Sequence, residues 1–222
     1  IPKALIDVAG KPLVIHALEF AARLRPDRIF VVGGYGFPLL AQELGRARRD
    51  NLALTGLDIE LLENTRFRDG NLISLLTARP RISQGFLLRN VDHIYRPGIA
   101  QVVVPEVHEV TAFIDTDRQL GADDMKVERS AEGRIRRIAK TLTTYDSGYV
   151  GMTRVPTAAL SRYWQTADQV LAQEGRTVHV EHILARLAET EAAPVCRDIS
   201  GHGWLEVDTP DERAAAEKAL SA

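Results

Sequence analysis

The stretch RIFVVGGYGFPLLAQELGRAR, residues 28–48, decides the fold class of this chain. It begins with an apolar run of strand length (28–33), continues through a glycine-rich turn, and ends in a segment whose apolar positions recur at helical spacing. Further buried strands are predicted at 59–62 and 85–88, with a helix at 71–77 between them. Such alternation is typical of an α/β domain with a largely parallel sheet that is covered on both faces.

The pattern continues on both sides of this stretch. A helix is predicted after Pro12, because apolar positions recur at helical spacing up to Pro26. Residues 125–129 and 134–139, separated by a Ser-Ala-Glu-Gly turn, predict an antiparallel hairpin. The remaining predicted elements are helices from about residues 156 and 179, strands at 195–199 and 204–207, and a closing helix after Pro210. We therefore expect a Rossmann-like, mixed and mostly parallel central sheet that is flanked by helices and carries an antiparallel hairpin insertion.

Length and composition restrict the classes of protein. One hydrophobic core can serve 222 residues, so we expect a single domain over residues 1–222. The 28 Lys and Arg residues nearly balance the 30 Asp and Glu residues, which removes the electrostatic attraction that drives binding to nucleic acid or to an anionic membrane. Cys196 is the only cysteine, which argues against an intrachain disulfide or a cysteine-based zinc site. No apolar run approaches the ~20 residues that span a bilayer, and residues 1–4 do not open a secretory signal, so we expect a cytoplasmic protein.

Two aspartates follow apolar runs of strand length. Asp92 comes shortly after the strand GFLL, and Asp208 ends the segment WLEVD. Open α/β sheets bind ligands at the carboxyl ends of their strands, and two carboxylates there can share one Mg²⁺ that also contacts phosphate. Each aspartate has a plainer interpretation: a turn or cap for Asp92, and the N-cap of the last helix for either Asp208 or Thr209. The pair carries more weight than either residue alone.

Lysine is rare in this chain, which has only five. A lysine in a strand or a tight turn is therefore a candidate phosphate contact, because its ammonium group is a compact point charge. Lys126, in the segment DDMKV, and Lys140, which follows the second strand of the predicted hairpin, are such candidates. The alternative is that both are solvated residues on the polar face of the hairpin.

The glycine cluster Gly33-Gly34-Tyr35-Gly36 does not match a dinucleotide-binding fingerprint, because Leu39 stands where the third glycine is needed. It predicts instead a sharp strand-to-helix turn whose backbone a flat base can approach. Asn71 and Ser74, one turn apart at a helix start, are candidates for hydrogen bonds to a base or ribose, although helix capping also explains this segment. Sequence patterns for a hydrolase elbow, a GKS or GKT phosphate loop or a Cys-His pair are absent.

Several short motifs stand in order along nearly the whole chain. Pro2-Lys3-Ala4-Leu5 and Gly10-Lys11-Pro12-Leu13 resemble the second half of the signature of sugar-phosphate nucleotidyltransferase-like enzymes, whose first half is a strand and a Gly-rich loop. The further matching segments are Val32 to Tyr35, Asn71 to Ser74, Asn90 to Tyr95, Asp124 to Val127, Ile138 to Lys140, Asp146 to Gly148 and Trp204 to Thr209. The pattern is most similar to the cytidylyltransferases of phosphorylated alcohols, of the inositol-1-phosphate and phosphocholine type, and to those of phosphonates such as 2-hydroxyethylphosphonate.

This resemblance implies a nucleotidyltransferase fold of the GT-A-like kind. It also implies a reaction in which CTP and a phosphate or phosphonate monoester give a CMP-linked product and pyrophosphate. A phosphate monoester has a second pKa of ~6 and is already an anion near neutral pH, so no general base is needed, and Mg²⁺ and lysines bring the anions together. The implied roles are Mg²⁺ binding by Asp92 and Asp208, phosphate contact by Lys3, acceptor contacts by Lys126, Lys140 and Asp146, and cytidine contacts by Gly34, Tyr35, Asn71 and Ser74.

Two alternatives stay open. A metal-dependent glycosyltransferase of related fold also uses a strand-end acid, but it usually carries an Asp-x-Asp pair where this chain has Asn90-Val91-Asp92. A catalytically inactive nucleotide-binding regulatory domain is the second alternative, because the sequence lacks the strand and Gly-rich loop of the family signature. Similar domains also occur fused to a second enzyme, so one domain of a larger bifunctional protein is a further expectation.

Overall fold

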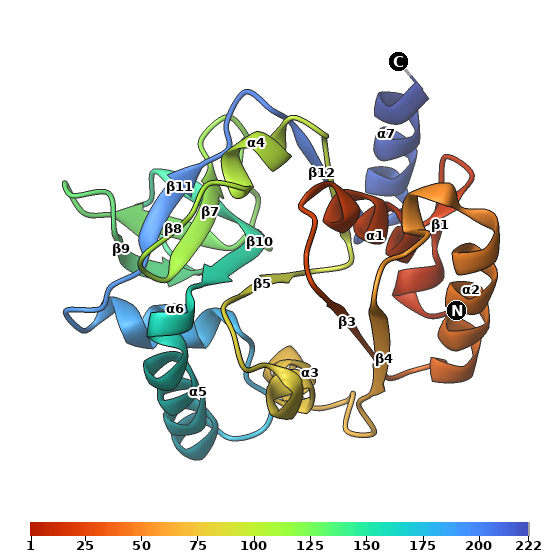
Figure 1. Ribbon diagram of the computed structural model, residues 1–222. Coiled ribbons are helices and arrows are strands. Elements are labelled where there is room, and N and C mark those ends of the chain that lie inside the picture. Colours follow the sequence, from red (N-terminus) through yellow and green to blue (C-terminus); the bar gives the residue numbers. More distant parts are fainter. Residues whose placement is uncertain (222) are drawn as a thin grey trace. The chain divides into compact units, whose positions relative to one another are not determined.

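The computed structural model describes residues 1–221 and divides into two compact units. Unit 1 consists of Ile1–Thr65, Asn90–Val104 and the segment from His202 onward. Unit 2 consists of Arg66–Arg89 and Pro105–Gly201. Each unit is therefore assembled from segments that are distant in the sequence (Figure 1).

Unit 1 contains two parallel strands, two antiparallel ribbons and four α-helices. The parallel strands are β3 (Ile29–Gly33) and β4 (Ile59–Glu63), which run side by side in Figure 1. The ribbons are β1 (Asp7–Val8) with β2 (Lys11–Pro12), and β6 (His93–Tyr95) with β12 (Trp204–Glu206). The helices are α1 (Leu13–Arg23), α2 (Phe37–Asp50), α4 (Ile99–Val103) and α7 (Pro210–Ser221), and 3₁₀ turns occupy Lys3–Leu5 and Leu52–Leu54.

The apolar faces of unit 1 form two clusters. One joins α1, α2 and β4 through buried residues such as Leu18, Leu44 and Ile59. The other joins β1, α1, β6 and α7 through Val8, Leu13, Ile94, Val207 and Ala216. This second cluster fixes the β6–β12 ribbon, which carries the candidate site described below.

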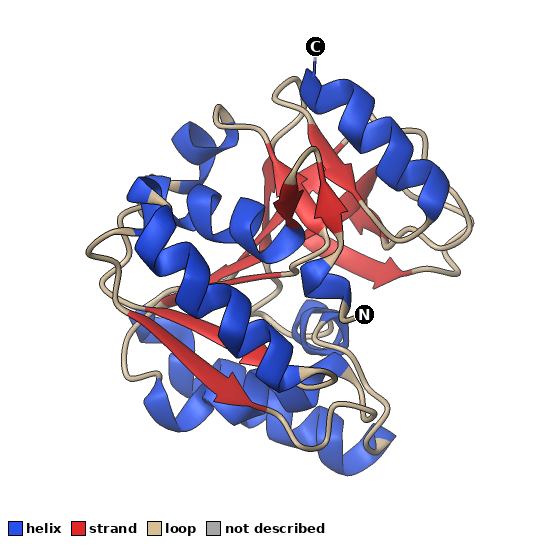
Figure 2. Cartoon of the chain, turned by 90° about the vertical axis from the view of Figure 1, so that its right-hand side faces the viewer, coloured by secondary structure: helices blue, strands red, loops and turns tan. Residues whose placement is uncertain are grey.

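Unit 2 is built around a six-stranded sheet with the order β11-β7-β10-β8-β9, in which β5 also pairs with β10. The strands are β5 (Phe86–Arg89), β7 (Thr111–Asp115), β8 (Lys126–Arg129), β9 (Ile135–Ala139), β10 (Ser147–Val155) and β11 (Val195–Asp198). The helices are α3 (Asn71–Ala78), α5 (Leu160–Glu174) and α6 (Glu181–Ala188), and 3₁₀ turns occupy Arg79–Arg81 and Thr157–Ala159. Residues of α5 and α6 share one buried cluster with β7, β9 and β10. In a second view, helices are blue and strands red (Figure 2).

The fold class predicted from the sequence is confirmed: strands and helices alternate, the large sheet is mixed, and β8 and β9 form the predicted antiparallel hairpin. The parallel pairs are β3–β4 and β11–β7. The other pairings of the six-stranded sheet are antiparallel. The sheet therefore has more antiparallel pairs than the sequence predicted. An apolar run shows that a strand is buried, but not the direction of its neighbour. Among residues 1–221, no helix has the length and apolar character that crossing a membrane requires.

Candidate functional site: a lysine between two aspartates

Asp92 and Asp208 lie at the same end of the β6–β12 ribbon in unit 1. The two strands are antiparallel, with Glu206 opposite His93, and the amide of Val207 donates to the carbonyl of Asp92 at 3.0 Å. Because neighbouring strands run in opposite directions, the residue before β6 and the residues after β12 come together. The sequence correctly predicted that the two carboxylates converge. As the sequence predicted, Asp92 follows the strand at 85–88, since β5 ends at Arg89; it also directly precedes β6.

Lys3 connects the two carboxylates. Its Nζ donates to Oδ2 of Asp92 at 2.8 Å and also to Oδ1 of Asp208. The neighbouring Pro2 is buried and packs against Gly36, where an added Cβ would lie only 2.4 Å from the Pro2 ring. Gly36 also has a φ of 65°, which favours glycine. The strand-to-helix turn therefore holds the start of the chain in place, and with it Lys3.

The charges of this cluster reinforce one another. Burial alone would raise the pKa of Asp92, but the hydrogen bond from His93 and the charges of His93 and Lys3 outweigh it and hold this pKa well below its usual range. Burial alone would lower the pKa of Lys3, but the nearby carboxylates of Asp92 and Asp208 raise it. Both shifts favour the charged forms, an anionic Asp92 and a cationic Lys3.

The helix that follows Asp208 is capped by other residues. The hydroxyl of Thr209 accepts a hydrogen bond from the amide of Glu212 at 3.2 Å, and Oε2 of Glu212 accepts from the amides of Asp208 and Thr209 at 2.8 and 2.9 Å. This reciprocal arrangement is a capping box. Of the two capping candidates left open by the sequence, Thr209 supplies the cap, while the Asp208 carboxylate contacts Lys3.

His93 is a further member of this cluster to which the sequence assigned no role. Its Nδ1 lies 2.7 Å from Oδ1 of Asp92, and its Nε2 lies 3.7 Å from Oε1 of Glu206. The imidazole is buried and stacks on Trp204, with ring centroids 5.1 Å apart. The only sequence signal was its place directly after Asp92. That Glu206 stands opposite depends on strand pairing, which the sequence pattern did not define.

The donor set of the carboxylate pair suits a divalent cation. Oδ2 of Asp92 and Oδ1 of Asp208 both reach one small cation, the Lys3 ammonium, so both oxygens can reach another cation near that point. Mg²⁺ at phosphate sites uses one or two carboxylates and keeps water and phosphate oxygens as its other ligands. Within the described part of the chain, no group of three or more His, Cys, Asp or Glu side chains is arranged to hold a metal. The two carboxylates would therefore leave the other positions of a metal to water or ligand oxygens, unlike an all-protein cage.

Gly34 and Tyr35 form the predicted strand-to-helix turn between β3 and α2. The amide of Phe37 donates to the carbonyl of Gly34 at 3.0 Å and closes this turn. The Tyr35 side chain is exposed. Both residues belong to unit 1, as do Lys3, Asp92 and Asp208.

Asn71 and Ser74 lie in unit 2, on the first turns of α3. Oδ1 of Asn71 accepts a hydrogen bond from the amide of Val180 at 2.8 Å, so this side chain anchors a loop of its own unit. The preceding Gly70 approaches the same loop so closely that an added Cβ would lie 1.8 Å from the Val178 carbonyl oxygen. Ser74 is half-buried one turn further along the helix.

Lys126, Lys140 and Asp146 also lie in unit 2. The Lys126 side chain is buried, and its Nζ donates to the carbonyls of Gly121 and Lys140 at 2.6 and 2.8 Å, with weaker contacts to those of Asp124 and Ala122 at 3.3 and 3.4 Å. Lys140 itself is exposed. Asp146 accepts a hydrogen bond from the amide of Arg129 at 2.8 Å. Burial alone would raise the pKa of Asp146, but the hydrogen bonds from Arg129 and Ser147 outweigh it and lower this pKa.

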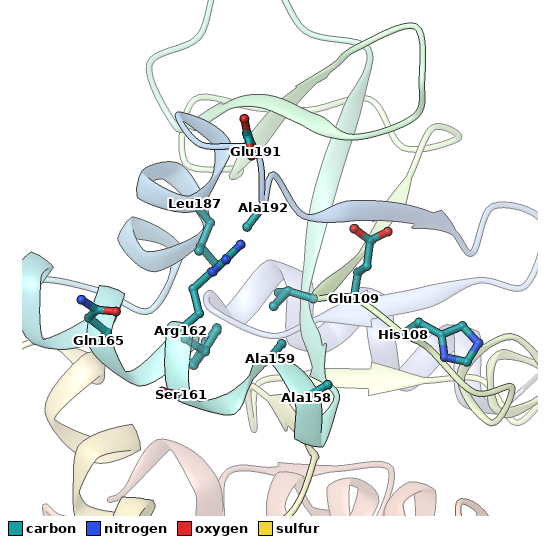
Figure 3. A pocket seen from close by; sticks show the side chains of 12 residues that line it. His108, Glu109, Ala158, Ala159, Ser161, Arg162, Gln165, Leu187, Glu191 and Ala192 are labelled. Carbon is teal, nitrogen blue, oxygen red and sulfur yellow. The ribbon is translucent and has the colours of Figure 1, made fainter.

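Unit 2 also contains a hollow of about 530 Å³ near the N-terminus of α5, lined among others by His108, Glu109, Arg162 and Glu191 (Figure 3). None of the candidate site residues lines it. Glu109 is paired with Arg134 at 2.9 Å. Elsewhere in the unit, burial raises the pKa of Cys196 to about 12, which favours the neutral thiol.

Three comparisons place the chain among known proteins. The family model described as "MobA-like NTP transferase domain" matches residues 2–122. Two proteins named bifunctional IPC transferase and DIPP synthase, from Aquifex aeolicus and Rubrobacter xylanophilus, are 25% and 26% identical over 99% and 98% of this chain. This chain covers 47% of each, so it spans about half the length of the curated relatives that it matches.

Solved structures share the fold. The inositol-1-phosphate CTP transferase from T. maritima superimposes with a TM-score of 0.81 at 18% identity, over 100% of this chain and 86% of that chain. The CTP:phosphocholine cytidylyltransferase from Streptococcus pneumoniae gives a TM-score of 0.75 at 15% identity, over 99% of this chain and 90% of the other. At these identities the structural likeness establishes the fold alone.

Proposed function

The chain belongs to the MobA-like NTP transferase domain family, and from that premise we propose that it is a CTP-dependent cytidylyltransferase. It transfers CMP from CTP to the phosphate or phosphonate of a small alcohol-type acceptor and releases pyrophosphate. The observation that carries this proposal is the convergence of Lys3, Asp92 and Asp208. One relative is named an IPC transferase, and one solved structure of the same fold is named an inositol-1-phosphate CTP transferase. Both names support CTP and a phosphorylated alcohol as the substrates.

In the proposed reaction, an oxygen of the acceptor phosphate attacks the α-phosphorus of CTP. The bond from the α-phosphorus to the bridging oxygen breaks, and pyrophosphate leaves with the electron pair. The acceptor phosphate is an anion near neutral pH, because its second pKa is ~6, so no residue has to remove a proton from it. This agrees with a site built from a lysine and carboxylates rather than around a general base.

The residues of unit 1 have defined roles in this proposal. Asp92 and Asp208 would hold Mg²⁺, and Lys3 would leave the carboxylates to contact the nucleotide phosphates. Mg²⁺ bound there would neutralise charge on the phosphates of CTP. Gly34 and Tyr35 offer an exposed turn to the cytosine base, whose hydrogen-bonding edge selects against other bases when the contacts are buried.

The residues of unit 2 are proposed contacts of the nucleotide (Asn71 and Ser74) and of the acceptor (Lys126, Lys140 and Asp146). Lys140 has an exposed side chain, whereas the Lys126 ammonium has to exchange carbonyl oxygens for phosphate oxygens before it can take this role. Single substitutions test each residue separately. A higher KM for the acceptor without a change in the KM for CTP would identify the acceptor group.

The decisive experiment measures pyrophosphate release by the full-length protein that contains this chain. CTP, ATP, GTP and UTP are each tested with Mg²⁺ and a panel of inositol phosphate, phosphocholine and phosphonate acceptors. We expect release with CTP and one acceptor class, and none without an acceptor. Equal binding of ATP and CTP by calorimetry would refute the base assignment, while transfer from a nucleotide sugar would favour the glycosyltransferase alternative.

A second enzyme domain in the same cytoplasmic protein completes the proposal. Its basis is the length of the relatives, which are named bifunctional. The intact mass of the natural protein tests this part independently of the activity. A protein of the length of this chain alone would refute it.

A further inference from the structure

His93 stands between two carboxylates. The residue belongs to β6 and is 5% exposed. Its Nδ1 lies 2.7 Å from Asp92 Oδ1, and its Nε2 lies 3.7 Å from Glu206 Oε1. Each ring nitrogen of this buried imidazole therefore faces an acidic side chain.

The ring orientation is fixed by stacking. The imidazole lies nearly parallel to Trp204 (5.1 Å, 13°) and to Tyr95 (6.0 Å, 15°), which come from the two strands of the ribbon. Ribbon pairing sets Trp204 opposite Tyr95 and Glu206 opposite His93. Tilting the imidazole out of this plane would therefore disturb both stacks, and the bond to Asp92 sets which edge of the ring faces the carboxylate.

The hydrogen bond of His93 divides the two oxygens of Asp92 between two tasks. Oδ1 is engaged by the imidazole, and Oδ2 contacts the Lys3 ammonium that also contacts Asp208. We propose that His93 is a positioning residue that fixes the rotation of the Asp92 carboxylate, so that Oδ2 faces the cation shared with Asp208. This inference rests on the proposed function in one respect, the binding of a divalent cation by the two aspartates. Imidazoles and carboxylates that orient metal ligands in this way typically change metal affinity by ~10–100-fold when removed.

Three substitutions separate positioning from core filling. His93→Asn places an amide nitrogen near the position of Nδ1 and keeps a donor for Asp92. His93→Gln places its amide nitrogen near the position of Nε2, on the side of Glu206. His93→Leu fills the space without a donor. His16→Leu is the matched control, because His16 lies in α1 of the same unit and bonds the Val8 carbonyl at 2.9 Å.

The experiment measures the affinity of the full-length protein for Mn²⁺ in the presence of CTP, with the melting temperature and the rate of pyrophosphate release for each variant. We expect His93→Asn to stay within about threefold of the parent Mn²⁺ affinity, and His93→Gln and His93→Leu to lose ~10–100-fold. The control His16→Leu should change the melting temperature without changing Mn²⁺ affinity. If His93→Leu fails to fold, the difference between His93→Asn and His93→Gln decides the question.

The outcomes separate this inference from the proposed function. Unchanged Mn²⁺ affinity in His93→Gln and His93→Leu, or an equal loss in all three variants, would overturn positioning through Nδ1 even if the protein transfers CMP. The expected pattern of Mn²⁺ affinities in a protein that releases no pyrophosphate would support the inference and refute the proposed function. A parent protein that binds no Mn²⁺ with CTP would overturn the inference.

Discussion

Lys3 and Lys126 have the same expected task, contact with phosphate, but they are held in different ways. Lys3 belongs to unit 1, its side chain is 40% exposed, and its partners are two carboxylates. Lys126 belongs to unit 2, is 6% exposed, and donates to four main-chain carbonyls. An exposed ion pair contributes roughly 0–1 kcal/mol to stability and exchanges partners easily, whereas buried carbonyls that lose their donor cost about 1–3 kcal/mol each.

This difference teaches that residue type and spacing do not define the role of a lysine. The Lys3 ammonium stands between carboxylates that also suit a cation, so ligand binding can replace it. The Lys126 ammonium ties the loop at Gly121–Asp124 to the end of β9 through the Lys140 carbonyl. We expect the loss of Lys3 to act mainly on ligand binding, and the loss of Lys126 to act on stability as well as on acceptor binding; the following predictions test that contrast.

The largest expected effect is on turnover in Asp208→Asn. Loss of one of two carboxylates should reduce pyrophosphate release by about 100- to 1000-fold, comparable to the removal of one transition-state contact. The melting temperature should hardly change, because Thr209 and Glu212 cap the following helix. The matched control is Thr209→Ala, which should lose about 1 kcal/mol of stability and keep its turnover. Parent-like turnover of Asp208→Asn at low Mg²⁺ would remove Asp208 from the metal site.

The next effect is on the stability of Lys126→Met. This change leaves buried carbonyl oxygens without their donor and should cost about 1–3 kcal/mol in chemical denaturation. Lys140→Met is the control, because Lys140 contributes only its main-chain carbonyl to this contact. A normal denaturation midpoint would contradict this structural role, whereas a raised KM for the acceptor would support the proposed phosphate contact of Lys126.

A smaller effect of opposite sign is expected for metal binding by Lys3→Met without nucleotide. Removing the ammonium frees both carboxylates, so Mn²⁺ should bind about tenfold more tightly, which corresponds to about 1.4 kcal/mol for the loss of one nearby positive charge. Turnover should fall in the same variant, since Lys3 is the proposed phosphate contact. Lys11→Met is the control, because Lys11 pairs with Glu19 at 2.8 Å. Weaker Mn²⁺ binding in Lys3→Met would contradict a competition between lysine and metal.

The smallest expected effect is on stability in acid. The pKa of Asp92 in the folded chain lies below its ordinary value of 3.8, so the folded state binds fewer protons than the unfolded chain as the pH falls. The stabilisation from this group is therefore present above pH 3.8 and is lost as the pH falls through the lower folded pKa. Relative to Asp92→Asn, the parent should lose about 2–4 °C more in melting temperature over this range, for a contribution of about 1 kcal/mol. An equal fall in melting temperature for the parent and for Asp92→Asn in acid would contradict a lowered pKa of Asp92.

Much of the fold could be predicted, because its signals are local. The apolar run before Gly33 and the helical spacing after it predicted β3 and α2, and the alternation around the Ser-Ala-Glu-Gly turn predicted the β8–β9 hairpin. The nine-residue strand β10 was not predicted, although it pairs with β5, β7 and β8. Eight of its residues are buried, so both of its faces are covered and the polar alternation that marks a half-exposed strand is missing.

The sequence by itself determined the α/β class and the strand-to-helix turn at Gly36, and it singled out Asp92 and Asp208 as candidates, because periodicity, turn chemistry and residue type can be read within a few positions. Only the tertiary structure decided that Lys3 joins the two aspartates across 89 and 205 positions of sequence, and that His93 faces Asp92. It also decided that Thr209 rather than Asp208 caps the last helix, and that Lys126 points at carbonyl oxygens. The physical reason is that strand pairing and side-chain direction depend on which distant segments pack together. A local sequence pattern does not specify those segments.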